Sequence, residues 1–213
     1  MKSNYELAAT KVSYCLLLTL LGLASQLPAQ TSLSDDPQLT DYYTTRELEE
    51  LTVLVNFFDS YVTEQTGEDD LQKAYVSFNK QQAAARLISL DILLDTVRAM
   101  FGRVNLPVWN SIWEYGSTGT YRSRDSLQMI VPMIDLNLHG AYWKFLLALA
   151  NTDEQIARYT KAIQLSGSLS PTLQGLYFNQ YYDYPVNFTP AANRLVAAVH
   201  YLTFHVQAAE HPE

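Results

Sequence analysis

Two carboxylates lie among aromatic residues and are the side chains of this sequence best placed to do chemistry. Glu114 follows a tryptophan in WNSIWEY, and Asp183 lies between tyrosines in YYDYP. Two carboxyl groups that face each other across a cleft are enough to hydrolyse a glycosidic bond. Aromatic neighbours favour the neutral form of a carboxyl group, so Glu114 is the candidate acid and Asp183 the candidate base or nucleophile. The resulting hypothesis is a hydrolase of an extracellular polymer.

The remaining residues give less support to catalysis. The only cysteine, Cys15, lies in an N-terminal apolar run, and no serine has the G-x-S-x-G surroundings of a nucleophile elbow. His200 and His205 are five residues apart, so on a helix they would not share the face that a metal-binding pair needs. The sequence therefore predicts no metal site and no cofactor, and it favours a non-catalytic protein over an enzyme.

Two aromatic-rich segments, at 109–121 and 175–188, are the candidate binding regions. Tyrosine and tryptophan combine a large, stiff surface with a polar edge and are frequent at binding hot spots. The candidate contact residues are Trp109, Trp113, Tyr115, Tyr121, Tyr182 and Tyr184. We expect the two segments to border a groove that binds a protein or glycan partner. The competing interpretation places the rings in the core, with 175–188 as a packed junction that holds the last helix.

The first 29 residues have the pattern of an export signal. Two lysines precede an apolar run at 12–24, and small residues follow where a peptidase would cleave, after Ala24 or Ala29. The run is shorter than the roughly 20 residues that span a bilayer. We therefore expect a periplasmic or secreted protein that keeps no membrane span and no cysteine after processing. A buried N-terminal helix is the alternative.

The composition of the chain excludes some classes of partner. The 213 residues are 48 % hydrophobic and 17 % charged, which is typical of one globular domain. The formal net charge is −8, and loss of the first 29 residues, with two lysines and one glutamate, makes it −9. Nucleic acids and anionic membranes bind basic patches, so neither is an expected partner.

Helical signals begin after a lead-in at 30–43, which is polar and expected to be flexible. Thr44 and Glu47 have the spacing of a capping box, in which each side chain accepts a hydrogen bond from the other residue's backbone N–H group. Apolar residues then recur every three or four positions, and Gly67 is suited to a left-handed helix end. The first helix is therefore predicted between Thr44 and Gly67.

The next helical segment covers 70–101. It is predicted to form either one long helix or two helices broken near Ser89, because a single helix of this length is unusual. From position 87 to position 104 the apolar residues keep a regular spacing of three and four. This part is therefore the candidate central helix of the domain.

The segment at 105–135 is predicted to be irregular. Pro107 would start a short helix that ends near Gly116, and the glycine- and hydroxyl-rich residues that follow would form an exposed loop. Residues 126–136 are apolar and interrupted by Pro132, which fits either an extended segment or a kinked helix. We favour the helix, because no segment nearby is predicted to be a partner strand.

Helical patterns return in the last third of the chain. Two helices joined by a short turn are predicted to lie antiparallel, the second starting at a capping box of Thr152 and Gln155 and ending at Gly167. A last helix follows Pro190. The prediction is an all-α domain at 44–209, built as an irregular bundle of about six or seven helices or as stacked helical hairpins.

One helix carries a partial repeat signature. Tyr159, Ala162 and Leu165 have the spacing of an aromatic residue, an alanine and a leucine, and here the chain resembles the second helix of a tetratricopeptide repeat. In the same register, Trp143 stands where that repeat has a small residue and Gly167 where it has proline. No second copy occurs at the repeat period of about 34 residues. A passive helical scaffold of this type is therefore an alternative function.

Overall fold

The computed structural model describes residues 31–85, 90–122, 128–169 and 186–210 of the chain. These residues are mostly helical, with a single two-stranded sheet, so the predicted irregular all-α bundle is confirmed. The expected export signal lies outside the described residues, and so does the segment 170–185.

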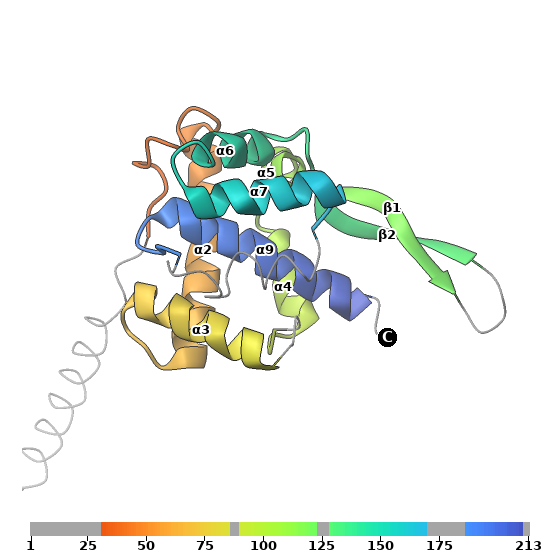
Figure 1. Cartoon of the computed structure of the whole chain (residues 1–213), viewed down its shortest axis with the longest axis horizontal. Coiled ribbons are helices and arrows are strands. Elements are labelled where there is room, and N and C mark those ends of the chain that lie inside the picture. Colours follow the sequence, from red (N-terminus) through yellow and green to blue (C-terminus); the bar gives the residue numbers. More distant parts are fainter. Residues whose placement is uncertain (1–30, 86–89, 123–127, 170–185, 211–213) are drawn as a thin grey trace, which may run out of the picture. The chain divides into compact units, whose positions relative to one another are not determined.

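The described elements follow one another in a simple order (Figure 1). They are α2 (Thr45–Thr66), α3 (Leu71–Ala85), α4 (Leu94–Phe101), α5 (Leu106–Ile112), β1 (Trp113–Arg122), β2 (Gln128–Leu136), α6 (Ala141–Leu149), α7 (Glu154–Ser166) and α9 (Ala191–Glu210). Because α3 ends before α4 begins, the segment at 70–101 contains two helices rather than one.

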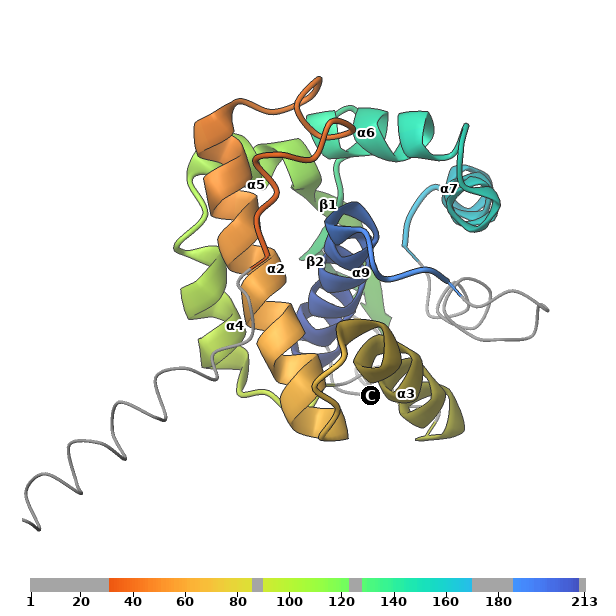
Figure 2. The same cartoon turned by 90° about the vertical axis from the view of Figure 1, so that its left-hand side faces the viewer.

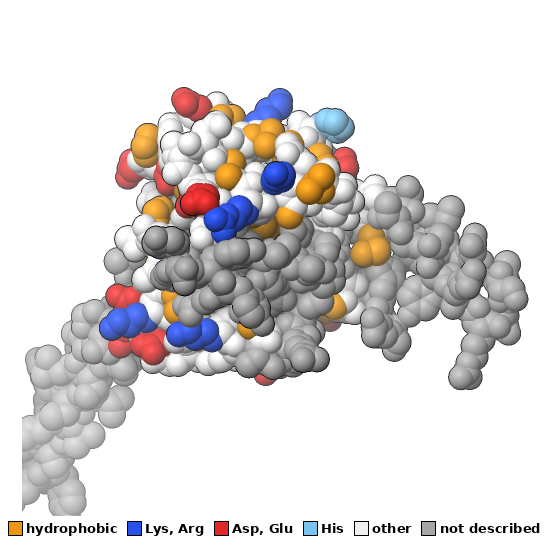
Figure 3. Space-filling model, in the orientation of Figure 1, with side chains coloured by type: hydrophobic (Ala, Val, Ile, Leu, Met, Phe, Trp, Pro, Cys, Tyr) orange, Lys and Arg blue, Asp and Glu red, His pale blue; other side chains and the backbone are white. Residues whose placement is uncertain are grey.

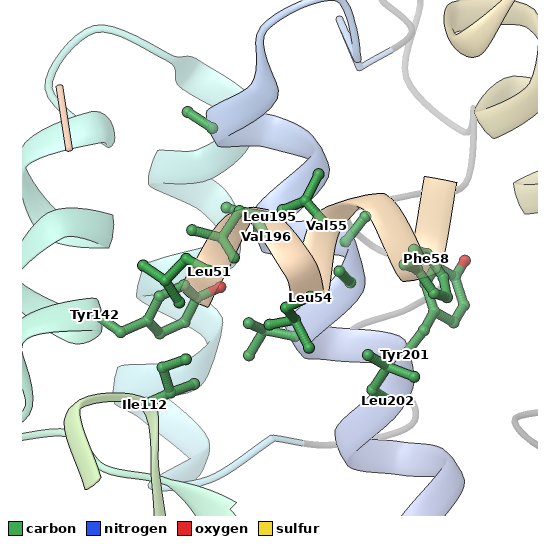
Figure 4. Close-up of a cluster of buried hydrophobic side chains, with 14 of the residues drawn as sticks. Leu51, Leu54, Val55, Phe58, Ile112, Tyr142, Leu195, Val196, Tyr201 and Leu202 are labelled. Atoms are coloured by element: carbon green, nitrogen blue, oxygen red, sulfur yellow. The ribbon is translucent and has the colours of Figure 1, made fainter. Parts of the chain in front are cut away.

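The hydrophobic core is centred on α9, which packs against α2 and has other helices around it (Figures 1 and 2). Figure 4 shows side chains of α2 beside side chains of α9: Leu51, Leu54, Val55 and Phe58 lie near Leu195, Val196, Tyr201 and Leu202. From Ala192 to Gln207, every residue of α9 is buried. The predicted central helix at 87–104 is wrong, because α4 starts only at Leu94 and is 8 residues long.

The local signals for helix ends are largely confirmed. The Thr44 backbone N–H donates to the Glu47 carboxylate at 2.8 Å, and the Glu47 N–H donates to Thr44 Oγ1, which completes the capping box. Gly67 ends α2 with φ of +68°, a left-handed conformation that glycine adopts without strain.

Helix α7 differs from the prediction in the residue that caps it and in its direction relative to α6. Its cap is Asp153, whose carboxylate accepts hydrogen bonds from the N–H groups of Gln155 and Ile156, and the box predicted at Thr152 is not formed. An ionised carboxylate at a helix N-terminus also complements the helix dipole. Figure 2 shows α7 end-on while α6 runs across the view, so these helices cross steeply instead of forming the predicted antiparallel hairpin.

The lead-in is not a flexible tail in its described part, residues 31–43. Leu33 and Leu39 have no exposed surface, and Tyr43 is 5 % exposed, so this segment contributes three side chains to the core. Its first residue is held by α2: the Thr31 N–H donates to Asn56 Oδ1 at 3.0 Å, and the Asn56 amide donates to the Thr31 carbonyl at 3.1 Å. The hydrophobic residues in an otherwise polar segment explain why it packs.

A buried ion pair joins this segment to both α2 and α9. Arg194 Nε lies 3.2 Å from Asp59 Oδ2, and both side chains are almost fully buried. Thr31 Oγ1 donates to Asp59 and accepts from the Arg194 guanidinium at 2.7 Å, while the Tyr75 hydroxyl donates to the other Asp59 oxygen at 2.7 Å. Buried charges are tolerated when they are paired and hydrogen-bonded, as both are here.

At the end of the second aromatic segment, Val186 and Phe188 are buried. Phe188 is 1 % exposed and stacks on Tyr75 with ring centroids 4.8 Å apart. The Gln72 side chain donates to the Val186 carbonyl and accepts from the Phe188 N–H, and Arg194 donates to the Phe188 carbonyl at 2.8 Å. These contacts fasten the start of α9 to α3.

The hairpin of β1 and β2 corrects two predictions. Residues 128–136 form a strand rather than the favoured kinked helix, and residues 117–122 of the predicted loop after Gly116 belong to β1. The two segments pair antiparallel, with Trp113 opposite Leu136, so each strand is the partner that the other needs. Pro132 falls where the register shifts opposite 116–119, at a bulge, which is where a strand tolerates a residue without an N–H group.

Candidate functional site

An open apolar cleft of about 480 Å³ is formed by residues of α4, α5, β1, β2, α9 and the turn after α4. We call it the aromatic cleft. It is lined by Arg98, Phe101, Gly102, Val104, Leu106, Trp109, Tyr115, Ile134 and Val206. It includes two of the aromatic residues that the sequence predicts for binding.

The short helix α5 positions one wall of the cleft. The Asn105 side chain caps this helix by accepting a hydrogen bond from the Val108 N–H at 3.0 Å. Asn105 is itself fixed to α2, because its backbone N–H donates to the Glu50 carboxylate at 2.8 Å. Because β1 follows α5 without a break, Trp109 and Tyr115 come from consecutive elements and meet.

A row of aromatic rings runs from the core to the mouth of the cleft. Tyr115 stacks on Trp109 with centroids 5.2 Å apart, Trp109 lies 6.1 Å from Trp113, and Trp113 lies 4.6 Å from Phe101. From Trp113, which has no exposed surface, the exposed fraction rises through the partly buried Trp109 to 70 % at Tyr115. Trp113 is therefore structural, while Tyr115 is open to a ligand.

Of the predicted binding residues, two line the cleft, one lies behind it, and the side chains of the other three are not described. Trp109 and Tyr115 line the cleft, whereas Trp113 supports it from behind and donates its indole N–H to Thr203 Oγ1 at 2.8 Å. Tyr121 belongs to β1, but its side chain is outside the described positions, and Tyr182 and Tyr184 lie outside the described residues. The groove between the two aromatic segments therefore stays a prediction.

Other lining residues were not predicted from the sequence. Leu106 is 69 % exposed beside a proline, and a large apolar residue at such a position is a weak signal of a binding surface. Among the described residues that line the cleft, Arg98 is the only charged one. The Arg98 guanidinium lies 3.8 Å from the Asp95 carboxylate. The exposed fraction of the side chain is 53 % for Arg98 and 96 % for Asp95. Val206 comes from α9, so only the tertiary fold brings it to this site.

Glu114, one of the two predicted catalytic residues, is separate from the cleft. Glu114 is exposed and lies opposite Asp135 across the hairpin, and neither of them lines the cleft. Burial raises the pKa of Asp135, the Leu136 and Leu169 N–H groups that donate to its carboxylate oppose this shift, and the charge of Glu114 adds to it. Asp183 lies outside the described residues, so its pairing with Glu114 stays a prediction.

His200, one of two buried histidines of α9, is enclosed by the protein. His200 has no exposed surface, and the Tyr159 hydroxyl lies 3.0 Å from its Nδ1 atom. Burial lowers the pKa of His200 to about 3. Within the described part of the chain, no group of three or more histidine, cysteine, aspartate or glutamate side chains is arranged to hold a metal ion.

The surface has a second hollow besides the aromatic cleft. A second hollow of about 430 Å³ lies between α2 and residues 91–96, and acidic side chains, Glu64 and Asp91, are part of its lining. On the face that Figure 3 shows, the described hydrophobic side chains are interspersed with acidic and basic ones. None of the helices in the described ranges combines the length and hydropathy required of a membrane span.

No protein-family model, curated protein or solved structure matches this chain. The function is therefore inferred from the geometry of the cleft.

Proposed function

We propose that this protein is an exported, non-catalytic binding protein that holds a hydrophobic group of its partner in the aromatic cleft. The observation that carries the proposal is an open, mostly apolar cleft of about 480 Å³ with Trp109 and Tyr115 stacked at its edge. Its volume lies in the range of roughly 300–1,000 Å³ that is usual for ligand sites.

The exposure of apolar side chains around the cleft supports this function. Tyr115 and Leu106 are 70 % and 69 % exposed, although both are large and belong to the lining. Covering apolar surface is favourable by about 25 cal/mol per Å², so a ligand that covers these side chains gains affinity from them. Ile134 and Val206, which also line the cleft, are 3 % and 4 % exposed, so most of their surface is already covered by the protein.

The chemistry of the lining favours a hydrophobic group of a protein or of a small molecule over a glycan. A sugar carries hydroxyl groups around its ring, and burying them without hydrogen-bond partners costs free energy. Of the lining residues that the structure describes, Arg98, Trp109 and Tyr115 have polar side-chain atoms, and the others are apolar or glycine. A hydrophobic side chain matches such a lining better than a sugar does.

Binding of N-phenyl-1-naphthylamine, a neutral apolar dye whose fluorescence rises in apolar sites, tests the proposal. We expect saturable binding that weakens about fivefold in Tyr115→Ser and in Leu106→Ser, since each change removes on the order of 1 kcal/mol of apolar contact. The matched control is Leu165→Ser, because Leu165 is 80 % exposed on α7 and does not line the cleft. Equal binding by all four proteins with unchanged circular dichroism would contradict the proposal.

A further inference from the structure

His205 of α9 accepts a hydrogen bond from the segment that leads into α4. The Leu90 backbone N–H donates to His205 Nδ1 at 3.2 Å, and the two residues are 4 % and 3 % exposed. One position further on, the Asp91 N–H donates to the Tyr61 hydroxyl of α2 at 3.0 Å. Two consecutive backbone N–H groups therefore attach this segment to α9 and to α2.

The start of α4 depends on how this segment is held. Leu93, at the N-cap of α4, makes no side-chain hydrogen bond to the helix, and α4 has 8 residues. Helices of this length are marginal on their own, so tertiary contacts have to fix their position. Residues 91–93 also line the second hollow, together with Tyr61.

A proton on His205 is incompatible with the hydrogen bond from Leu90. A neutral imidazole accepts at one ring nitrogen and donates from the other, whereas an imidazolium donates from both. Since Nδ1 is the acceptor for the Leu90 N–H, a proton on Nδ1 would point at another donor and repel it. Burial also disfavours the charged ring unless it is paired. Protonation of His205 is therefore coupled to release of the segment.

We propose that His205 is an acid-sensitive latch, which holds residues 90–93 against α9 while its ring is neutral and releases them when the ring is protonated. Release removes one of the attachments of the start of α4. The latch is independent of the function proposed for the aromatic cleft.

The charge state of His205 is set mainly by burial. Burial lowers its pKa from 6.5, and a smaller effect of the Ile92 backbone raises it. Titratable and charged groups on the elements around it are Tyr61 and Glu64 on α2, Asp91 in the segment, Asp95 and Arg98 on α4, Asp135 on β2, and His200 on α9 itself. None of these groups is among the causes of the pKa shift. The latch is therefore closed at pH 7, and it opens progressively as the pH falls below 6.5.

Amide hydrogen exchange at Leu90, measured by NMR at pH 7, 6 and 5, tests the latch. The protection factor relates the observed rate to that of an unstructured amide, so it removes the pH dependence of exchange itself. We expect Leu90 to lose protection by up to about tenfold for each pH unit below 6.5, because opening takes up one proton. The Val199 amide, in the buried centre of α9, is the control for global unfolding and should be better protected at every pH.

The variant His205→Asn separates a latch from a purely structural side chain. The amide oxygen of asparagine is bonded to Cγ, as Nδ1 is in histidine, so it keeps an acceptor in a similar position without titrating. Leu90 should stay protected with no pH dependence, whereas Val199 should keep the pH dependence that His200 causes. The matched control His139→Asn changes an exposed histidine before α6 and should leave the pH dependence at Leu90 unaltered.

A second variant covers the case in which His205→Asn does not fold. His205→Phe keeps a ring of similar volume but removes both the acceptor and the titration. Leu90 should then be about fivefold less protected at pH 7, as for the loss of one hydrogen bond, and its protection should not depend on pH. The latch is overturned if Leu90 in the wild-type protein loses no protection below pH 6.5, if it loses it equally in either His205 variant, or if Leu90 and Val199 are equally protected at each pH.

Discussion

At the scale of single residues, His200 shows how burial sets a charge state. It lies inside α9 without exposed surface, and desolvation lowers its pKa from 6.5 to about 3. The imidazole is therefore neutral in the folded protein at pH 7. The hydroxyl of Tyr159 stays protonated, because burial raises its pKa, and it shares a hydrogen bond with Nδ1. Two groups with titratable protons thus form a neutral buried contact.

Folding stability should fall between pH 6.5 and pH 5 because of His200. In the unfolded chain the imidazole takes up a proton near pH 6.5, whereas in the folded protein it does so only near pH 3. The stabilising contribution is complete above pH 6.5 and decreases by about 1.4 kcal/mol for each unit below it. His205, whose pKa burial also lowers, adds to this trend. Urea unfolding at pH 7, 6 and 5 measures the effect.

The variant His200→Gln isolates this contribution from that of other groups. Asp135 acts in the opposite direction, because its raised pKa gives a stability that is present at low pH and is lost as pH rises above 3.8. The difference in slope between the wild-type protein and His200→Gln removes the Asp135 contribution. An identical slope in both proteins would show that His200 is not neutral when folded.

At the scale of elements, the turn between β2 and α6 depends on a close approach of two backbones. A Cβ atom at Gly140 would lie 2.1 Å from the carbonyl oxygen of Ser111, at the end of α5. The turn is also tied to this end of α5 by hydrogen bonds from Asn137 to the carbonyls of Ile112 and Asn110. This contact fixes the helix that carries Trp109.

Substitution Gly140→Ala should destabilise the protein by about 2 kcal/mol or more, because a methyl group forces the two backbones apart. Gly102→Ala is the control: its φ is −67°, and a Cβ atom there would lie 3.5 Å from its nearest neighbours, an ordinary contact. Its free energy of unfolding should change by less than about 1 kcal/mol. Equal loss in both variants would contradict the close approach. Urea unfolding measures both.

An element can be predicted from the sequence when the residues that specify it lie within a few positions of one another. The capping box at Thr44 and the left-handed Gly67 act within a few residues, and both are confirmed. The hairpin was missed because β1 contains glycines and hydroxyl residues that are typical of a loop, and a strand needs a partner that periodicity does not identify. Helix α9 was predicted, but not as the centre, because a helix buried on all sides has no single apolar face.

The candidate site was predictable only where its residues lie close together in the sequence. Trp109 and Tyr115 were found from their residue types, since they lie close together in the sequence and are aromatic. The sequence gives no local sign that Arg98, Ile134 and Val206 meet them, because these residues come from α4, β2 and α9. The meeting of an arginine with this apolar lining is a property of the tertiary fold.

At the scale of the whole molecule, residues 31–43 belong to the folded domain. Leu33, Leu39 and Tyr43 are buried, and Thr31 hydrogen-bonds to Asp59 and Arg194. A buried leucine stabilises a domain by about 1.5–3 kcal/mol, which is a large part of the total of about 5–15 kcal/mol. The domain boundary therefore lies before Thr31 instead of at Thr44.

A chain that begins at Thr44 should be largely unfolded, whereas one that begins at Gln30 should fold, as measured by circular dichroism and urea unfolding. If the shorter chain gives no soluble protein, the double variant Leu33→Ala, Leu39→Ala in the longer chain measures the same contribution, with an expected loss of about 4 kcal/mol or more. Full stability of either altered protein would show that this segment is dispensable.

The central position of α9 also sets the order of events when the chain is made. Ribosomes release the N-terminal segments first, so α2 emerges before the helix that covers its apolar face. Arg194, which closes the ion pair with Asp59 and binds Thr31, arrives later still. In a nascent chain, α2 therefore lacks this packing partner until α9 has been released.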